Sequence, residues 1–378
     1  MKILHLITSL DTGGAEKMLL KLLSKMDRKQ FDSIVVCLIP AGPVGKQITD
    51  LGVPVETLGL KRGHISPKGL FRCVQLIKKY RPDIIQTWLY HADLLGYLAS
   101  RLTGFTNLIW NIRCTNMDLE KYSKVTTWVV KACAFFSNYP VAILSNSDIA
   151  KGQHIELFGY NSKKFEIILN GFDLSVFKPD KESGMKVRLE LGLLKDAICI
   201  GLVGRYDPQK DHASFIKAAQ IVHQQFPDID YIMAGKDVNP DNMEIVSLLR
   251  ETSLENRFKL LDERSDVPDI MNALDFCCSS SAFGEGFPNV VGEAMACGVP
   301  CVVTDVGHSA VVVGATGIVV PPRQHEALAK AIMEFVLLPQ KERIELGQKA
   351  RQRIELNYSL EKIVGQYEAL YHRIGRSS

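Results

Sequence analysis

The chain has 378 residues, of which 46% are hydrophobic and 23% are charged, as in globular proteins long enough to form two domains. The net charge of +3 is uneven, because residues 1–175 hold 22 Lys and Arg against 14 Asp and Glu, and the remainder holds 23 against 28. The sequence has no Cys-x-x-Cys pair, no apolar run of about 18 residues and no basic module with interleaved aromatics, which argues against a zinc site, a membrane-spanning helix and a nucleic-acid partner.

Nine cysteines, most of them in apolar runs, indicate buried free thiols in a reducing compartment. The N-terminal residues 1–7 become polar too quickly for a signal peptide. We therefore expect a cytoplasmic protein. The basic first half could meet an anionic lipid or a phosphorylated substrate.

Short apolar runs alternate with amphipathic segments along the chain, which predicts an α/β fold with parallel sheets and right-handed crossovers. A linker is expected at about 174–184, where Pro, Ser and Lys occur. Strands are expected at 3–7, 33–39, 53–58, 84–88, 108–112, 144–147, 167–169, 198–204, 231–234, 258–261, 273–278 and 301–304. Helices are expected at 15–26, 45–51, 67–80, from 91 onward, and at 121–136, 185–191, 213–225, 243–252, 269–273, 324–337, 339–356 and 359–374.

Gly13 and Gly14 follow the first strand and open the first helix. The order strand, Gly-rich loop, helix is that of many phosphate sites, but the spacing is not that of the dinucleotide-binding G-x-G-x-x-G motif. The alternative is a tight turn without a ligand, because glycine is the default turn residue.

His91 lies just past the strand 84–88, where ligands of parallel sheets collect. A histidine there could polarise a hydroxyl or donate to a phosphate, or it could be a helix-start residue satisfied by the backbone. Arg113 and Asn116 follow the strand 108–112 in the same way. They could bind an acceptor or a phosphate, or form a salt bridge within the loop.

The strand 198–204 delivers Arg205 and, five residues later, Lys210 to one loop. A guanidinium fork and an ammonium point charge both suit a diphosphate, and together they could neutralise a departing nucleoside diphosphate without a metal. The pair Asp228 and Asp230 has the form that metal-dependent transferases use. It precedes a strand, so we interpret it as a solvated loop and expect no metal site.

Residues 283–304 read as a Gly-rich loop, a helix, a turn and a strand. Pro288 suits the first turn of a helix, and Gly298 suits its left-handed end. Such a loop presents amides and a helix dipole to an anion. Glu285 lies in the loop and Glu293 on the helix, flanking that site. The alternative for Glu293 is a solvated residue on a helix.

These residues carry a resemblance to a known family. Glu285, seven residues and Glu293, within Gly-Phe-Pro-Asn-Val and Glu-Ala-Met-Ala-Cys-Gly-Val-Pro, resemble the donor-site signature of the retaining glycosyltransferases of family 4. The resemblance implies the GT-B fold, which has two Rossmann-like domains of doubly wound parallel sheets facing across a cleft. It also implies that Glu285 binds the donor sugar and Glu293 the nucleotide ribose.

Other segments are similar to the same family. Gly204-Arg205 and Lys210 match its Gly-Arg-x-x-x-x-Lys motif, and Gly13-Gly14-Ala15 its N-terminal motif at the donor phosphate and the acceptor. Trp88 departs from the pattern, because it stands where the family often has a polar residue. The implied catalytic residues are Glu285, Arg205, Lys210 and His91, and the implied donor-binding residues are Gly13, Gly14, Arg264, Phe287, Pro288, Asn289, Val290 and Glu293.

The resemblance implies an acceptor-binding domain at 1–175, onto which the last helix, at about 359–378, packs back, and a donor-binding domain at 176–358. It implies a metal-independent hexosyl- or N-acetylhexosaminyltransferase without a cofactor. The donor would be a UDP- or GDP-linked sugar and the acceptor a glycan or polyprenyl-linked sugar of cell-surface polysaccharide synthesis. The alternatives are a non-catalytic nucleotide-sugar or glycan-binding module, and an epimerase or phosphorylase on the same scaffold.

The helix expected at 121–136 has two interpretations. Its apolar and aromatic residues could form the buried face of an amphipathic core helix. In membrane-associated members of the family, basic and aromatic helices of the first domain touch the lipid surface, which implies peripheral contact with the cytoplasmic face of the membrane. The residues concerned are Trp128, Val129, Val130, Phe135 and Phe136.

Overall fold

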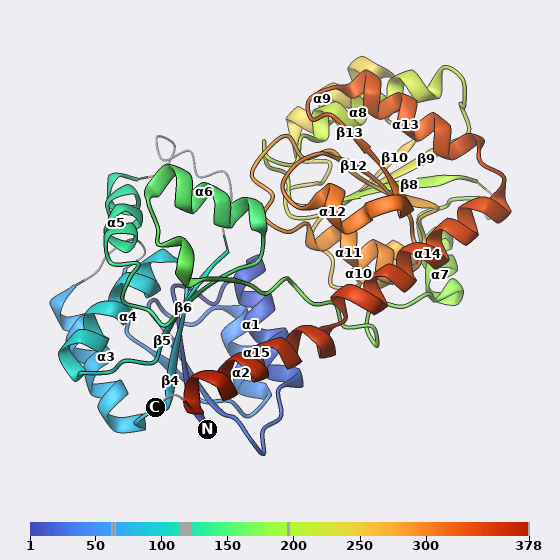
Figure 1. Ribbon diagram of the computed structural model, residues 1–378. Helices are drawn as coiled ribbons and strands as arrows, with labels where there is room; N and C mark the ends of the chain where they lie inside the picture. The colour runs from blue at the N-terminus through green and yellow to red at the C-terminus, as the bar shows by residue number, and fades with distance from the viewer. Residues whose placement is uncertain (62, 64–65, 114–122, 195–196, 377–378) are drawn as a thin grey trace. The chain divides into compact units, whose positions relative to one another are not determined.

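The computed structural model describes residues 1–61, 63, 66–113, 123–194 and 197–376 (Figure 1). The chain divides into two compact units. Unit 1 comprises Met1–Gly171 and Leu360–Ser378, and unit 2 comprises Phe172–Ser359. All eight cysteines of the described ranges are buried and free. In the same ranges, no helix is both long and apolar enough to cross a membrane.

Unit 1 is built on a parallel sheet of seven strands in the order β3-β2-β1-β4-β5-β6-β7. Alternate residues of the first strand enter opposite cores, Ile3 and Ile7 on one side and Leu4 and Leu6 on the other. The strands are β1 (Lys2–Ile7), β2 (Asp32–Cys37), β3 (Val55–Thr57), β4 (Ile84–Trp88), β5 (Leu108–Ile112), β6 (Ala142–Ser145) and β7 (Phe165–Ile167).

Helices cover both faces of this sheet (Figure 1). One face packs against α1 (Gly14–Lys25), α2 (Pro43–Asp50) and the C-terminal helix α15 (Leu360–Arg376). The other packs against α3 (Pro67–Tyr80), α4 (Tyr90–Thr103) and α5 (Lys124–Phe135), with α6 (Asp148–Phe158) beside α5 and the short 3-10 turn η2 (Ser162–Lys164) before β7.

Unit 2 has a parallel sheet of six strands in the order β10-β9-β8-β11-β12-β13. Its strands are β8 (Cys199–Val203), β9 (Asp230–Ala234), β10 (Phe258–Leu261), β11 (Phe276–Ser279), β12 (Cys301–Thr304) and β13 (Gly317–Val320). One face packs against α8 (His212–His223), α9 (Met243–Thr252) and α13 (His325–Leu337). The remaining elements are α7 (Lys181–Glu190), α10 (Val267–Asn272), α11 (Asn289–Ala296), α12 (Ser309–Val313), η3 (Gly314–Thr316) and α14 (Gln340–Tyr358).

The predicted fold class, with two parallel-sheet α/β units, is confirmed. Two helices, α6 and α12, were not predicted. The start of α6 does carry a signal, because the Ser147 hydroxyl accepts from the Ala150 amide as a helix cap.

The interpretation of Asp228 and Asp230 as a solvated loop was wrong for one of the two residues. Asp230 begins β9 and is buried, whereas the side chain of Asp228 is exposed. Arg257 lies 3.3 Å from Asp228 and 3.5 Å from Asp230, so both carboxylates share one guanidinium. No group of three or more His, Cys, Asp or Glu residues that could hold a metal occurs in the described ranges.

Candidate active site

The strand order of each sheet reverses once, between β1 and β4 in unit 1 and between β8 and β11 in unit 2. In open α/β sheets, ligands bind outside the carboxyl ends of the strands at this switch point. Gly13 and His91 follow β1 and β4, and Lys210 and Glu285 follow β8 and β11. The topology therefore places the predicted residues at the ligand-binding edge of their own unit.

In unit 2, hydrogen bonds join the loop after β8 to the loop after β11. The Ser280 hydroxyl donates to the carbonyl oxygens of Lys210 (2.8 Å) and Asp211 (3.0 Å). The Ala282 amide donates to the Gln209 carbonyl oxygen at 2.8 Å. These hydrogen bonds hold the two loops together at the switch point, and we call this pair of loops, residues 204–211 and 280–288, the ledge.

Glu285 is buried at this ledge and forms an ion pair with Lys210. Its Oε1 accepts from the Lys210 ammonium and from the Ser281 hydroxyl, the latter at 2.7 Å. Thr304 Oγ1 donates to the Ser281 carbonyl oxygen at 2.6 Å and so fixes Ser281. No described residue donates a hydrogen bond to Oε2, which is therefore available to a ligand.

Ser281 and Thr304 were not among the predicted site residues. Each lies at or just past the carboxyl end of a strand, β11 or β12, and these two strands are neighbours. That position is a signal that sequence reasoning could have used.

The two predicted cations differ in burial. The side chain of Lys210 is 18% exposed, and that of Arg205 is 57% exposed and lies 3.1 Å from Asp207 Oδ2. Asp207 also accepts from the Gln209 amide at 2.9 Å, which shapes the turn between the two cations. Lys210 is thus held against the buried Glu285, whereas Arg205 is exposed and paired with Asp207.

Helix α11 follows the Glu285 loop, and Pro288 is its N-cap residue rather than a residue of its first turn. Gly298 has the predicted left-handed conformation, with φ +76°. Glu293 lies half-buried on the helix, and Asn289 and Val290 form its first turn. Their contacts with a nucleotide remain predictions.

Phe287 is buried in the core of unit 2. Its ring lies 6.0 Å from that of Phe172, 5.7 Å from that of Tyr358 and 5.8 Å from that of His308. A contact of Phe287 with a donor would therefore come from its backbone.

Gly307 sets the position of the Glu285 loop. It has φ +59°, and a Cβ there would lie 1.8 Å from the Glu285 carbonyl oxygen. Gly307→Ala is expected to displace the loop and to lower the sugar transfer that the resemblance implies about 10²-fold, the typical cost of a 1 Å misplacement. Gly192→Ala is the control, because Gly192 has φ +67° and open space around it. The control should lose about 1 kcal/mol of unfolding free energy and keep its activity. Equal activities of the two variants would contradict this role of Gly307.

Arg264, predicted to contact the nucleotide, is held by two carboxylates. It binds Asp266 through Nε (2.8 Å) and Nη2 (2.6 Å), and Glu190 through Nη1 (2.6 Å). Its guanidinium keeps the pKa values of Asp266 and Glu190 below their ordinary range. The observed arrangement ties the loop after β10 to α7, and a contact with a nucleotide base remains a prediction.

In unit 1, Gly13 is the N-cap residue of α1 and Gly14 its first residue. Gly13 has φ −87°, a value that any residue can adopt. The backbone conformation of a tight turn therefore does not explain why this residue is a glycine. A Cβ at Gly13 would instead lie 2.2 Å from Oε2 of Glu16. The glycine therefore leaves the space that the Glu16 carboxylate occupies.

His91 is the second residue of α4 and is half-buried. Burial lowers its pKa, so the imidazole is neutral at neutral pH, and its Nε2 has no hydrogen-bond partner in the described part of the chain. The preceding Leu89 has φ 72° and ψ 153°, a strained conformation for a leucine, and such strain is common at functional turns. Trp88 is fully buried in β4 and stacks on Tyr367 of α15 at 6.4 Å.

Arg113 makes contacts that serve the structure of unit 1. Its Nη2 donates to Asn170 Oδ1 at 2.5 Å, its Nη1 to the Tyr367 hydroxyl at 3.4 Å, and its guanidinium lies 5.5 Å from the Trp88 ring centre. These contacts help to hold α15 and the turn at Asn170. Asn116 lies outside the described residues.

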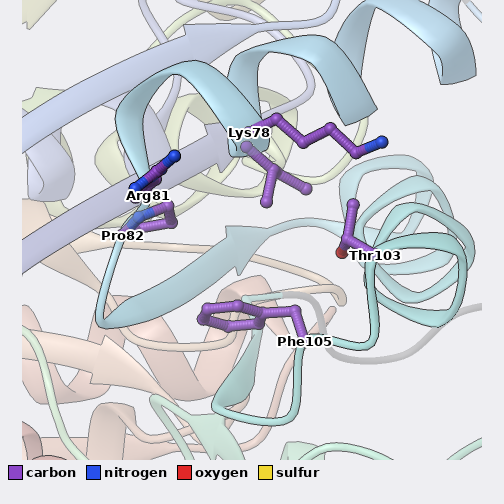
Figure 2. A pocket seen from close by; sticks show the side chains of 6 residues that line it. Lys78, Arg81, Pro82, Thr103 and Phe105 are labelled. Atoms are coloured by element: carbon purple, nitrogen blue, oxygen red, sulfur yellow. The ribbon is translucent and has the colours of Figure 1, made fainter.

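A surface pocket of about 420 Å³ lies between the end of α3 and the loop after α4 (Figure 2). Lys78, Arg81, Pro82, Thr103 and Phe105 line it, together with Ile77. These segments precede β4 and β5, so the pocket lies at the amino edge of the sheet, opposite to the edge where the predicted site residues lie.

Comparisons with known proteins agree with this geometry. Residues 12–176 match the model of glycosyltransferase family 4, and residues 197–337 match that of the glycosyl transferases group 1. The chain has the same fold as the Anabaena protein HepE in complex with UDP, with a TM-score of 0.86, 24% identity and coverage of 99% of this chain and 100% of that one.

Two curated relatives are named glycosyltransferases. The chain is 27% identical to the Escherichia coli UDP-Gal:α-D-GlcNAc-diphosphoundecaprenol α-1,3-galactosyltransferase, over 81% of this chain and 80% of that one. It is 28% identical to the Campylobacter jejuni N-acetylgalactosamine-N,N'-diacetylbacillosaminyl-diphospho-undecaprenol 4-α-N-acetylgalactosaminyltransferase, over 79% of each. The chain therefore belongs to the glycosyltransferases of the GT-B fold, with a family 4 domain in its N-terminal part and a group 1 domain in its C-terminal part.

Proposed function

We propose that the protein transfers a sugar, with retention of anomeric configuration, from a UDP- or GDP-linked donor to a glycan or polyprenyl-linked acceptor of cell-surface polysaccharide synthesis. The observation that carries this proposal is the buried Lys210–Glu285 pair at the switch point of unit 2. The names of the two relatives support a lipid-linked acceptor, and the UDP complex of HepE supports a nucleotide donor.

The proposed transfer reaction depends on the charged groups around the donor. Arg205, Lys210 and the N-terminus of α11 would stabilise the diphosphate as it leaves, where negative charge develops. Oε2 of Glu285 would accept from a donor sugar hydroxyl, and Glu293 would bind the ribose. The departing phosphate would take the proton of the attacking acceptor hydroxyl. Because Arg205, Lys210 and the N-terminus of α11 would stabilise the departing diphosphate, this step requires no metal.

A panel of nucleotide sugars tests the proposal. The protein is incubated with each donor and with lipid-linked glycans, and release of nucleoside diphosphate is measured. We expect release with one class of donor. Binding of the nucleotide without release would point to a non-catalytic binding module, and release with none of the donors would contradict the proposal.

We further propose that unit 1 contacts an anionic membrane through the outer stripe of α5. The stripe combines Trp128 (63% exposed) and Phe135 (79% exposed) with the exposed Lys124 and Lys131. The opposite side of α5 packs into the core through Val129, Val130 and Cys133. Helix α5 thus has a buried core face and an exposed aromatic and basic face, the two interpretations that the sequence allowed. It has no acidic residue to repel anionic lipid.

Vesicle flotation tests this surface. Lys124→Gln/Lys131→Gln is expected to weaken binding to vesicles of phosphatidylcholine with phosphatidylglycerol about 30-fold, from about 1 kcal/mol for each charge. The control Lys341→Gln/Lys349→Gln removes two exposed charges from α14 of unit 2. The two double variants would bind equally if α5 does not face the lipid.

A further inference from the structure

One buried carboxylate of unit 1 has no place in the function described above. Glu16, the third residue of α1, is 6% exposed. The Ser9 hydroxyl donates to its Oε1 at 2.7 Å. Its Oε2 has no hydrogen-bond partner in the described part of the chain and is not sealed from solvent. A carboxylate oxygen that solvent reaches and that no protein donor occupies can accept a hydrogen bond from a ligand.

The carboxylate of Glu16 lies against the Cα of Gly13. A Cβ on Gly13 would stand 2.2 Å from Oε2, so the glycine makes room for this carboxylate. A glutamate at this helix position commonly accepts from the N-cap amide, here that of Gly13, in a capping box. That hydrogen bond is not formed, although both residues are described. Helix capping therefore does not account for the position of Glu16.

The surroundings of Glu16 suit a neutral ligand. Burial raises the pKa of the Cys37 thiol, at the end of β2, to about 11, and the nearby charges of Asp11 and Glu16 add to the rise. No described cation forms an ion pair with Glu16. A phosphate at Oε2 would be repelled, whereas a sugar hydroxyl would donate to it.

We propose that Glu16 binds a hydroxyl group of the acceptor glycan. The inference rests on the proposed function. Thr8 Oγ1 donates to the Trp88 carbonyl oxygen at 3.4 Å, which joins the ends of β1 and β4, and Glu16 and His91 follow these two strands. Glu16 thereby places a polar, sugar-binding group at the switch point of unit 1.

The test compares Glu16→Gln with Glu361→Gln, which alters an exposed carboxylate of α15 in the same unit. The probe is α-D-GlcNAc-diphosphoundecaprenol in detergent, with the donor that the nucleotide-sugar panel identifies. Glu16→Gln is expected to raise the KM for the probe at least tenfold, and to leave the Kd for UDP within twofold of wild type and Tm unchanged. A KM within twofold of wild type, or a rise that accompanies a lower Tm, would overturn the inference.

Direct binding of the probe separates this inference from the proposed function. If the wild-type protein releases no nucleoside diphosphate with any donor, the proposed function fails. The inference is then decided by equilibrium binding of the probe to wild type and to Glu16→Gln. Weaker binding by the variant supports it, and equal binding, or none by wild type, overturns it.

Discussion

Glu285→Gln is expected to lower sugar transfer by about 10²- to 10³-fold, the range for a preorganised polar group that stabilises a transition state. The same change should leave the affinity for UDP unchanged or make it tighter. Glu285 is the ion-pair partner of Lys210, so removal of its charge frees the ammonium for the diphosphate. Transfer should therefore fall without a loss of UDP affinity, and the two quantities can be measured by initial rates and by titration calorimetry.

Two controls sharpen this prediction. Glu361→Gln removes a carboxylate far along the chain from the ledge, on α15, and should change neither quantity. Glu285→Ala should lower transfer further and abolish it, because alanine lacks the amide oxygen with which glutamine could still accept from a sugar hydroxyl. Wild-type turnover in either Glu285 variant would show that the donor sugar binds elsewhere.

Lys210→Ala is expected to weaken nucleotide binding by about 1.5–3 kcal/mol, as for other hydrogen bonds to charged groups. The variant also leaves the buried Glu285 without a cation. Loss of one partner of a buried ion pair typically costs about 3–5 kcal/mol of unfolding free energy. The Ser281 hydroxyl, which still donates to Glu285, should hold the loss near the lower end of that range. Calorimetry measures the first effect, and urea denaturation the second.

The double variant Lys210→Ala/Glu285→Gln separates the two effects. It removes both charges of the pair, so most of the unfolding free energy should return while the nucleotide affinity stays low. Lys217→Ala, at an exposed position on α8, is the single-charge control. Nucleotide affinity that is unchanged in Lys210→Ala would remove Lys210 from the diphosphate site.

Sequence periodicity was sufficient to predict several elements to the residue. The expected strands 84–88, 108–112, 258–261 and 301–304 coincide with β4, β5, β10 and β12, and the expected helices 67–80 and 243–252 coincide with α3 and α9. Most of these segments are apolar or amphipathic, and turn or capping residues bound them. Helix α12 has only five residues, too few for a periodic signal, and Ser147 at the start of α6 was not recognised as a cap.

The site was predictable in its placement and not in its contacts. Strand ends and Gly-rich loops are local features, and they indicated which residues reach the carboxyl edges of the sheets. The Lys210–Glu285 pair joins residues 75 positions apart, and the support of Ser281 by Thr304 joins two strands. Such contacts depend on strand order, which periodicity does not contain.

A sequence motif also does not specify the direction in which each side chain points. Phe287 belongs to the donor-site signature, yet its ring packs into the core of unit 2. Gly13 was expected to serve a ligand or a turn, and it makes room for the carboxylate of Glu16. Asp230 was expected in solvent, and it is buried at the start of β9, where Arg257 pairs with its carboxylate.

The most direct test of the donor site and its chemistry is a proton NMR time course of the wild-type protein with an α-linked nucleotide sugar and a lipid-linked glycan. The donor's anomeric signal should be replaced by that of an α-linked product, with nucleoside diphosphate formed in equal amount. Glu285→Gln should show neither change on the same timescale. A β-linked product, or no conversion of any donor by the wild-type protein, would contradict the account.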